Sequence, residues 1–270
     1  MNQGTNKVYI DEILVLSSGS TDKTDMIVEE FSKRNGRVVL LRQDRREGKA
    51  SAVNELLRVT STDVLVLESA DTIPREETIE RLCQSFMNGK VGMTGAHPMP
   101  VNDEDDCMGC VTHLIWKLHH RIAMRTPKCG ELIAFRMIFN RIPADIAVDE
   151  AWIEYEILRR GYDIVYVPDA IVYNKGPENV RDHIRQRRRI ACGHLDLARR
   201  TKYRVSSLHA NILLLALLEV FPLFKPREWP HFFGAMVLEG LSRILGYYDF
   251  VKGERHVIWD IAETTKRVQL

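Results

Sequence analysis

The stretch SSGSTDKT, residues 17–24, ends in Lys23 and Thr24, which match the last two residues of the P-loop motif that binds phosphate. That motif also requires two glycines, which let backbone N–H groups wrap the phosphate. Ser17 and Asp22 occupy the two glycine positions here, and the Asp22 carboxylate would repel a phosphate. The sequence therefore excludes a P-loop and favours a turn whose small polar residues cap the start of a helix.

A second short motif, C-x-x-C, is formed by Cys107 and Cys110. A structural zinc site needs four ligands, and no second cysteine pair or nearby set of histidines completes one. The five cysteines are an odd number spread over 270 residues, which favours free thiols in a reducing compartment over a disulfide framework. We therefore expect a cytoplasmic protein whose cysteines are free.

Composition allows a sizeable core, since 45% of the residues are hydrophobic. A chain of this length can form one large domain, or one domain with an appendage. The formal net charge is +1, so no global excess of positive charge points to nucleic acid, and we expect no nucleic-acid partner.

Three short apolar runs, at 12–17, 37–41 and 63–68, do not alternate with polar residues. Such runs are typical of strands covered on both faces of a parallel sheet. Helical patterns separate them, which predicts a doubly wound, mainly parallel α/β sheet. Ligands gather at the carboxyl ends of strands in such sheets, so SSGSTD (17–22) and ESADT (68–72) should lie on the same rim.

The middle of the chain predicts further elements. We expect helices over 76–87, 112–125 and 149–160, a loop over 97–112, and strands at 162–168 and 170–174. Residues 178–200 form a very basic helical pattern. Such a helix could line a site, or it could stay exposed and meet RNA or an anionic lipid.

The last third of the chain is more apolar. Residues 210–224 and 231–248 are interrupted by charged residues and a proline, whereas a spanning helix needs about 20 mostly apolar residues. Two interpretations stay open. These helices could pack against the domain or a second copy of the chain, or they could contact a bilayer surface through Trp229, Phe232 and Phe233.

Five segments in a fixed order resemble the family 2 glycosyltransferases of the GT-A fold. They are SSGSTDKT (17–24), EGKASAVNELL (47–57), VLVLESADTIP (64–74), DEAWIEYEILRRGYDIVYVPDAIVY (149–173) and QRRRI (186–190). They are similar to the family's DDGSTDGT turn, GKAxAxN segment, xDxD turn, ED helix and QxxRW box. The resemblance spans about residues 11 to 200. It implies a GT-A domain over 1–200 and a helical appendage over 201–270.

The resemblance implies an inverting enzyme that moves a sugar from a nucleotide-sugar, which we expect to be UDP-linked, to an acceptor hydroxyl. Glu150, beside Asp149, would be the base that takes the acceptor's proton, and Asp71 would hold Mg²⁺ or Mn²⁺. The other implied site residues are Ser18, Asp22 and Lys49 on the donor, together with Asp71, and Gln186 and Arg189 in the acceptor and diphosphate region.

The implied partners are a nucleotide-sugar and a saccharide or lipid-linked acceptor, as in polysaccharide or glycolipid biosynthesis. Contact with the cytoplasmic face of a membrane and a homo-oligomer are further expectations. Structural interpretations stay open for several residues. The Asp149–Glu150 pair suits the positive end of a helix, and Lys49 could start a solvated helix.

Four differences separate the chain from the family pattern. No counterpart of the family's first strand, with its PxxNE-like turn, is visible, so we expect either that the sequence starts late or that half of the base pocket is absent. Ser18 stands where the family has an acid, and Glu68 lies one place before the expected metal turn. The ED order is reversed, and Ile190 replaces the tryptophan of QxxRW. The SSGSTD and ESADT turns are similar to those of archaeal-type members.

Two other functions fit part of the pattern. A non-catalytic GT-A remnant would bind a partner or a lipid surface without transferring sugar. A nucleotidyltransferase would carry a glycine-rich loop with a basic residue after its first strand, and no such loop is visible.

Overall fold

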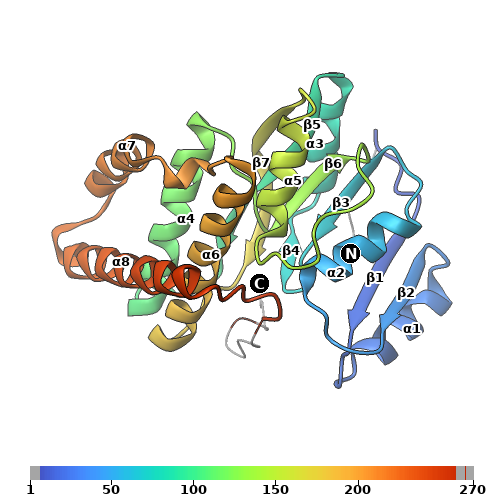
Figure 1. Ribbon diagram of the computed structural model, residues 1–270, viewed down its shortest axis with the longest axis horizontal. Helices are drawn as coiled ribbons and strands as arrows, with labels where there is room; N and C mark the ends of the chain where they lie inside the picture. Colours follow the sequence, from blue (N-terminus) through green and yellow to red (C-terminus); the bar gives the residue numbers. More distant parts are fainter. Residues whose placement is uncertain (1–6, 260–264, 266–270) are drawn as a thin grey trace.

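A computed structural model describes residues 7–259 and residue 265 (Figure 1). Its elements follow one another in the order β1 (Ile13–Ser18), α1 (Thr24–Arg34), β2 (Val38–Gln43), α2 (Lys49–Val59), β3 (Val64–Glu68), β4 (Thr72–Pro74), α3 (Thr78–Gln84), β5 (Val91–Pro100), α4 (Cys107–Arg125), β6 (Leu132–Arg136), α5 (Asp149–Leu158), β7 (Asp163–Asn174), α6 (Val180–Thr201), α7 (Ala210–Val220) and α8 (Trp229–Lys252).

The strands form two hydrogen-bonded sheets. β1 and β2 pair in parallel, and five further strands pair in the order β3–β6–β5–β7–β4. In the larger sheet β5 and β7 are parallel, whereas β6 runs antiparallel to β3 and β5, and β4 runs antiparallel to β7. The predicted α/β class is confirmed. The sheet is mixed, because β4 and β6, which the sequence did not predict, run against their neighbours.

Both faces of the larger sheet are covered, as its apolar strands predict. Along β6, Ile133 and Phe135 pack in a core with α2 and α5, while Leu132 and Ala134 pack in a second core with α3. Successive side chains of a strand point to opposite faces, so one short strand serves two cores. Burying an apolar side chain of this size stabilises the fold by roughly 1.5–3 kcal/mol.

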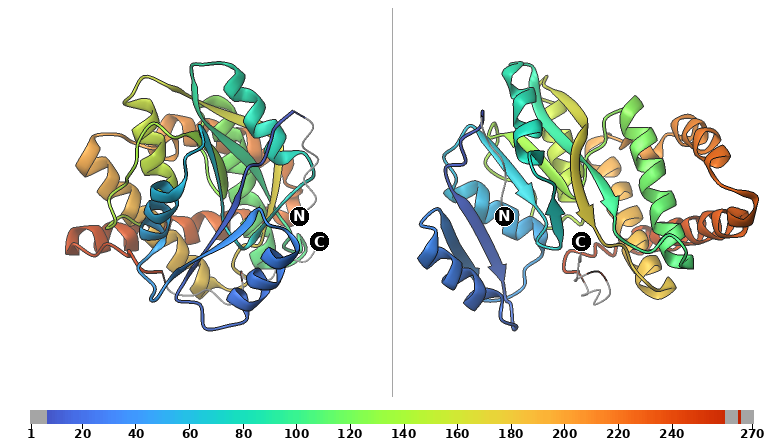
Figure 2. Two further views of the ribbon diagram at one scale, coloured as in Figure 1. Left: turned by 90° about the vertical axis from the view of Figure 1, so that its right-hand side faces the viewer. Right: turned by 180° about the vertical axis from the view of Figure 1, so that it is seen from behind.

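The helical part of the molecule lies beside the larger sheet, on the side away from β1 and β2 (Figures 1 and 2). Its core joins α7 and α8 to α4, which comes much earlier in the chain. α6 packs along α8 and joins this helical layer to the sheet. The helical region therefore draws on α4 and α6 as well as on residues after 200.

α8 turns its two acidic side chains, Glu239 and Asp249, inward. Glu239 pairs with Arg187 of α6 and with Arg243, at 2.8 and 2.9 Å, and Asp249 pairs with Arg188 of α6. The outer face of α8 carries apolar side chains that recur every three or four residues and are 42–70% exposed: Phe233, Val237, Leu241, Ile244, Tyr248 and Val251. Within the described residues, no helix combines the length and the apolar character needed to cross a membrane.

Three predictions about the middle of the chain need correction or refinement. The predicted loop over 97–112 is confirmed only for residues 101–106, because β5 continues to Pro100 and Asp106 caps α4 by accepting hydrogen bonds from Met108 N and Gly109 N. The two strands predicted at 162–168 and 170–174 are one strand, β7. The basic helix is confirmed as α6, and Arg187, Arg188 and Arg200 are ion-paired within the chain.

Candidate active site

A cavity of about 290 Å³ lies between the larger sheet and the helical layer. It brings together five of the residues singled out from the sequence: Lys49, Asp71, Glu150, Gln186 and Arg189. They come from the starts of α2 and α5, from the turn between β3 and β4, and from α6. Elements separated by more than 100 residues in the chain therefore meet around one space.

Ser18, Asp22 and Asp149 do not line this cavity. Ser18 ends β1, and its Oγ donates to Arg45 O at 3.4 Å. Asp22 lies two residues before α1, and its Oδ1 accepts a hydrogen bond from Thr24 N, the first residue of the helix, at 3.0 Å, whereas Lys23 occupies the N-cap position. Asp149 is 1% exposed and lies behind Glu150.

Lys49 joins the two carboxylates at the start of α5. Its Nζ donates to Glu150 Oε1 and lies 3.3 Å from Asp149 Oδ2. Burial alone would raise the pKa of Glu150, but the charge and hydrogen bond of Lys49 outweigh it and hold that pKa below its usual value. Burial and the neighbouring Glu150 raise the pKa of Asp149 to about 7. Glu150 is therefore the ionised, cavity-facing member of the pair.

Glu131 is a site residue that the sequence did not reveal. It lines the cavity with Asp71 and has a left-handed backbone, with φ +62°, which is uncommon for a residue other than glycine. Ser69 N donates to Glu131 O at 3.4 Å, which ties this residue to the turn that carries Asp71. Burial, followed by the charges of Asp71 and Glu150, raises the pKa of Glu131 to about 7.

Oxygen donors at this end of the cavity fit a hard divalent cation. Asp71 and Glu131 supply carboxylates, and the side-chain oxygen of Asn174, at the end of β7, is buried without a hydrogen-bond partner. Mg²⁺ and Mn²⁺ prefer carboxylate, carbonyl and water oxygens. These residues would therefore suit either ion.

The segment from Glu254 to Trp259 follows α8, and Trp259 lines the cavity. The Trp259 ring lies 3.5 Å from the guanidinium carbon of Arg189 and 5.6 Å from Lys49 Nζ. Gly48, with φ +93°, leaves room for this segment, because a Cβ there would lie 2.5 Å from Val257 O. Burial lowers the pKa of Arg189 to about 10, but the side chain stays charged. No pattern in the sequence indicated Trp259 as a wall of the site.

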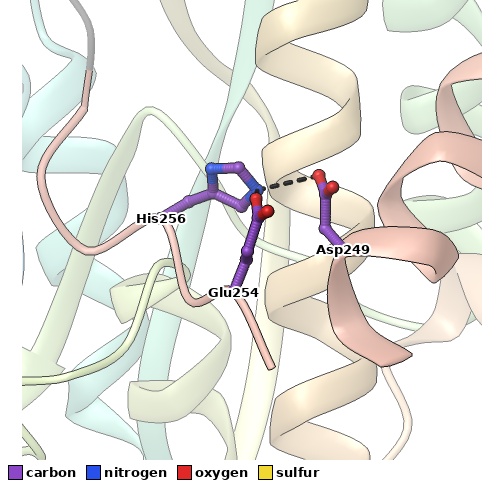
Figure 3. Close-up of side chains that lie close together, drawn as sticks. All are labelled: Asp249, Glu254 and His256. Carbon is purple, nitrogen blue, oxygen red and sulfur yellow. Dashed lines mark hydrogen bonds and ion pairs between the residues drawn. The ribbon is translucent and has the colours of Figure 1, made fainter. Parts of the chain in front are cut away.

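A cluster of ionisable residues anchors this segment to α8 (Figure 3). His256 Nε2 lies 2.9 Å from Asp249 Oδ2 and 3.8 Å from Glu254 Oε2. One imidazole and two carboxylates at this spacing can hold a metal ion. Here, however, the Arg188 guanidinium donates hydrogen bonds to both oxygens of Asp249. A cation in that position would have to displace the guanidinium, so the cluster is an ion-pair anchor.

Replacing Lys49 should change the pH dependence of any reaction that uses Glu150 as a base. In Lys49→Met, burial is no longer opposed by the lysine charge, so the pKa of Glu150 rises. Because a base must be ionised, the acid limb of the kcat/KM profile should move to higher pH, by about one unit or more. The measurement is a pH–rate series. Lys33→Met, on the exposed end of α1, is the control and should keep the wild-type profile.

Comparison with known families identifies the class of protein. The model of the family described as "Glycosyl transferase family 2" matches residues 2–143, more than half of the chain. The chain belongs to this family, as the ordered motifs predicted. Among curated proteins it is similar to the poly-beta-1,6-N-acetyl-D-glucosamine synthase of Staphylococcus aureus, with 23% identity over 195 residues. That match covers 67% of this chain and 47% of the synthase, so the chain spans about half the length of this relative.

Solved structures share the fold. A mannosyltransferase from Pyrobaculum calidifontis, in complex with GDP-Man and Mn²⁺, superposes with a TM-score of 0.62 at 19% identity and covers 89% of this chain and 77% of its own. Glucosyl-3-phosphoglycerate synthase from Mycobacterium tuberculosis, with Mn²⁺ and uridine-diphosphate, gives 0.50 at 18% identity, with 73% and 71% covered. The predicted GT-A fold with a helical C-terminal region is therefore confirmed.

Proposed function

We propose that this family 2 glycosyltransferase moves a sugar from a nucleotide-sugar to an acceptor hydroxyl with inversion, assisted by a divalent metal. The observation that carries the proposal is the cavity-facing Glu150, paired with Lys49, in one cavity with Asp71 and Arg189. We propose a UDP-linked donor, a saccharide or lipid-linked acceptor, and a GT-A domain over 1–200 followed by the helical region.

In this proposal Glu150 accepts the proton of the acceptor hydroxyl while the nucleoside diphosphate leaves. The Lys49 ammonium and the Arg189 guanidinium face the same cavity and would stabilise negative charge on the departing diphosphate. A divalent cation, when held by Asp71, Glu131 and Asn174, would neutralise the same diphosphate. Ser18, at the end of β1, and Asp22, just before α1, remain candidates for contacts to the nucleotide, and Gln186 for contacts to the acceptor.

A donor panel tests the proposal. UDP- and GDP-sugars would be titrated into the protein by calorimetry with and without Mn²⁺, and released nucleotide would be followed with each donor. We expect metal-dependent binding of at least one donor. The anomeric configuration of a transferred sugar, read by NMR, tests inversion. A protein that binds none of the donors in the presence of Mn²⁺ would be the non-catalytic remnant.

The outer face of α8 supports contact with a membrane surface. Its exposed apolar stripe, from Phe233 to Val251, is flanked by Lys225 and Arg227 before the helix and by Lys252 at its end, all exposed. Helices that lie on a bilayer present this combination of apolar and basic residues. If two copies of the chain paired through this stripe, with α8 parallel or antiparallel, these cations would lie near those of the other copy and repel them. The repulsion favours an anionic lipid surface over a dimer.

Charges placed on the stripe should weaken binding to vesicles. Burying each of Val237 and Ile244 contributes roughly 1.5 kcal/mol or more, so the Val237→Glu, Ile244→Glu protein should bind at least about tenfold more weakly to vesicles with phosphatidylglycerol. Co-sedimentation measures this. Met87→Glu, at a residue 91% exposed in the turn after α3, is the matched control. Equal sedimentation of all three proteins would contradict membrane contact, and a change in native mass would indicate a dimer.

A further inference from the structure

The cavity continues beyond Glu150 into a region between α4, α6 and α8. We call this region the inner lobe and define it by five basic side chains that line it: His119, Lys128, His183, Arg187 and His194. His119 comes from α4, and the last three come from α6. None of the five was assigned a role in the proposed transfer, although they share one continuous space with Glu150.

Polar groups of the inner lobe are buried without partners. His119 is 7% exposed and neither of its ring nitrogens has a hydrogen-bond partner, and His183 is 1% exposed with Nε2 unpaired. Among the residues that the structure describes, Lys128 makes no ion pair or hydrogen bond. Leaving a buried polar group unpaired costs roughly 1–3 kcal/mol. His119 and His183 are two such residues facing one cavity, which indicates a site that a polar ligand completes, and the half-buried Lys128 adds a charged donor to it.

The charges of the lobe select an anion. Lys128, Arg187 and Arg243 carry three positive charges, and Glu239, already shared by the two arginines, carries one negative charge. Burial and the neighbouring arginine lower the pKa of Lys128 to about 8, as expected of an amine with no counter-ion. Glu154 opposes this effect, because its negative charge raises the pKa of Lys128.

Glu154 is held by other groups. Its Oε1 accepts from Cys129 N at 2.8 Å, and its Oε2 accepts from the Tyr203 hydroxyl at 2.9 Å. Burial raises the pKa of Glu154 to about 7, so its negative charge is reduced at neutral pH. Even with Glu154 fully ionised, the inner lobe holds the three positive charges of Lys128, Arg187 and Arg243 against the two negative charges of Glu239 and Glu154, an excess that an anionic ligand would balance. A phosphate suits lysine and arginine donors of this kind.

The remaining wall of the cavity is apolar. It is built by α4, α7 and α8 from Ile115, Trp116, Leu118, Ile122, Leu213, Leu217 and Met236. α7 also exposes Leu214, Leu215 and Leu218 on its other side, each 48–63% exposed. A ligand that fits both walls has an anionic group at one end and an apolar chain at the other.

We propose that the inner lobe binds the phosphate group of an amphipathic acceptor, whose apolar chain lies against α4, α7 and α8. The inference rests on the proposed function, because it supplies the substrate class for the acceptor side of the same cavity. Glu154 stands one turn after Glu150 on α5, so a ligand bound in the lobe lies next to the proposed base. The donor end, with Lys49 and Asp71, stays available to the nucleotide-sugar.

Calorimetric titrations with octyl phosphate, inorganic phosphate and octanol test the proposal. Octyl phosphate should bind the wild-type chain at least about tenfold more tightly than either of the other two, since each of them fills only one wall. Lys128→Met should raise the Kd for octyl phosphate at least about tenfold, and Lys128→Arg should stay within about threefold of wild type. Lys90→Met, an exposed lysine at the start of β5, is the matched control and should keep the wild-type Kd.

Thermal melts give a second readout that does not depend on one variant folding well. Octyl phosphate should raise the Tm of wild type and of Lys128→Arg, because a ligand that binds the folded state stabilises it. If inorganic phosphate binds as tightly as octyl phosphate, the ligand needs no apolar chain. The proposal of an amphipathic acceptor would then be wrong, and the inner lobe would be a site for a free anion. If octyl phosphate binds the Lys128→Met protein as tightly as the wild type, the inner lobe does not bind its phosphate group.

A nucleotide-sugar titration on the same preparation separates this inference from the proposed function. If a nucleotide-sugar binds with Mn²⁺ and octyl phosphate does not, the inference is wrong and the proposed transfer stands. If octyl phosphate binds through Lys128 and no nucleotide-sugar binds, the inner lobe is a phosphate site and the proposed transfer is wrong.

Discussion

Glu150→Gln should lower kcat for sugar transfer by about 10²–10⁴-fold, the range typical of losing a positioned general base. Glutamine keeps the size of the side chain but cannot accept a proton. The effect should fall on kcat, because the substituted amide would keep the shape of the cavity and the donor end would still hold Lys49, Asp71 and Arg189. Steady-state kinetics with a donor found in the panel, together with calorimetric donor affinity, measure the two effects separately.

The matched control for this variant is Glu30→Gln, on the exposed side of α1, which should keep wild-type kcat. Glu150→Asp tests the position of the carboxylate instead of its charge, because it keeps a carboxylate but shortens the side chain by one methylene. We expect it to retain more activity than Glu150→Gln. If Glu150→Gln keeps most of its activity while Asp149→Asn loses it, the base would be Asp149, as the reversed order of the two acids would also allow.

The parts of the site that the sequence predicted are those held by local motifs. Lys49 follows Gly48 at the start of α2, and Glu150 stands in the first turn of α5, so each is placed by the start of a helix. A short motif of this kind determines the local backbone that positions its side chain. The fold then completes the site by bringing strand ends and helix starts together. Lys49, Asp71, Glu150, Gln186 and Arg189 therefore meet in one cavity.

The parts that the sequence missed depend on contacts between distant segments. Glu131 faces the site because it takes a left-handed backbone before β6, a strand of five residues whose apolar pattern is too short to separate strand from helix. Trp259 reaches Arg189 and Lys49 only because the chain turns back after α8. Neither contact produces a periodic pattern of apolar residues from which it could be predicted.

The orientation of α8 shows a related difficulty. Its charged residues Glu239 and Arg243 interrupt an apolar run, and in an isolated sequence they suggest an outward polar face. They instead point inward because α6 offers Arg187 as a partner. Breaking a buried ion pair of this kind leaves an unpaired charge and costs about 3–5 kcal/mol. The pairing between the two helices therefore decides which face of α8 is left exposed.

Asp71→Asn should remove most of the metal dependence of donor binding. Among the three oxygen donors at this end of the cavity, Asp71 is exposed, whereas Glu131 is half-buried and Asn174 is buried, so a substitution at Asp71 disturbs the fold least. Replacing a charged ligand by a neutral amide weakens binding of a divalent cation, because affinity follows the charge of its ligands. We expect the nucleotide-sugar affinity in Mn²⁺ to fall by about 100-fold, on the order of 3 kcal/mol.

Calorimetry of the best donor with Mn²⁺ and with a chelator measures this effect. Wild type should lose affinity on chelation, and Asp71→Asn should bind almost equally weakly in both conditions. Asp63→Asn, at the opposite end of β3, is the matched control and should respond to the chelator as wild type does. If Asp71→Asn keeps the full Mn²⁺ dependence, another carboxylate holds the metal. Glu68, at the end of β3, and Glu131, just before β6, would then be the residues to test.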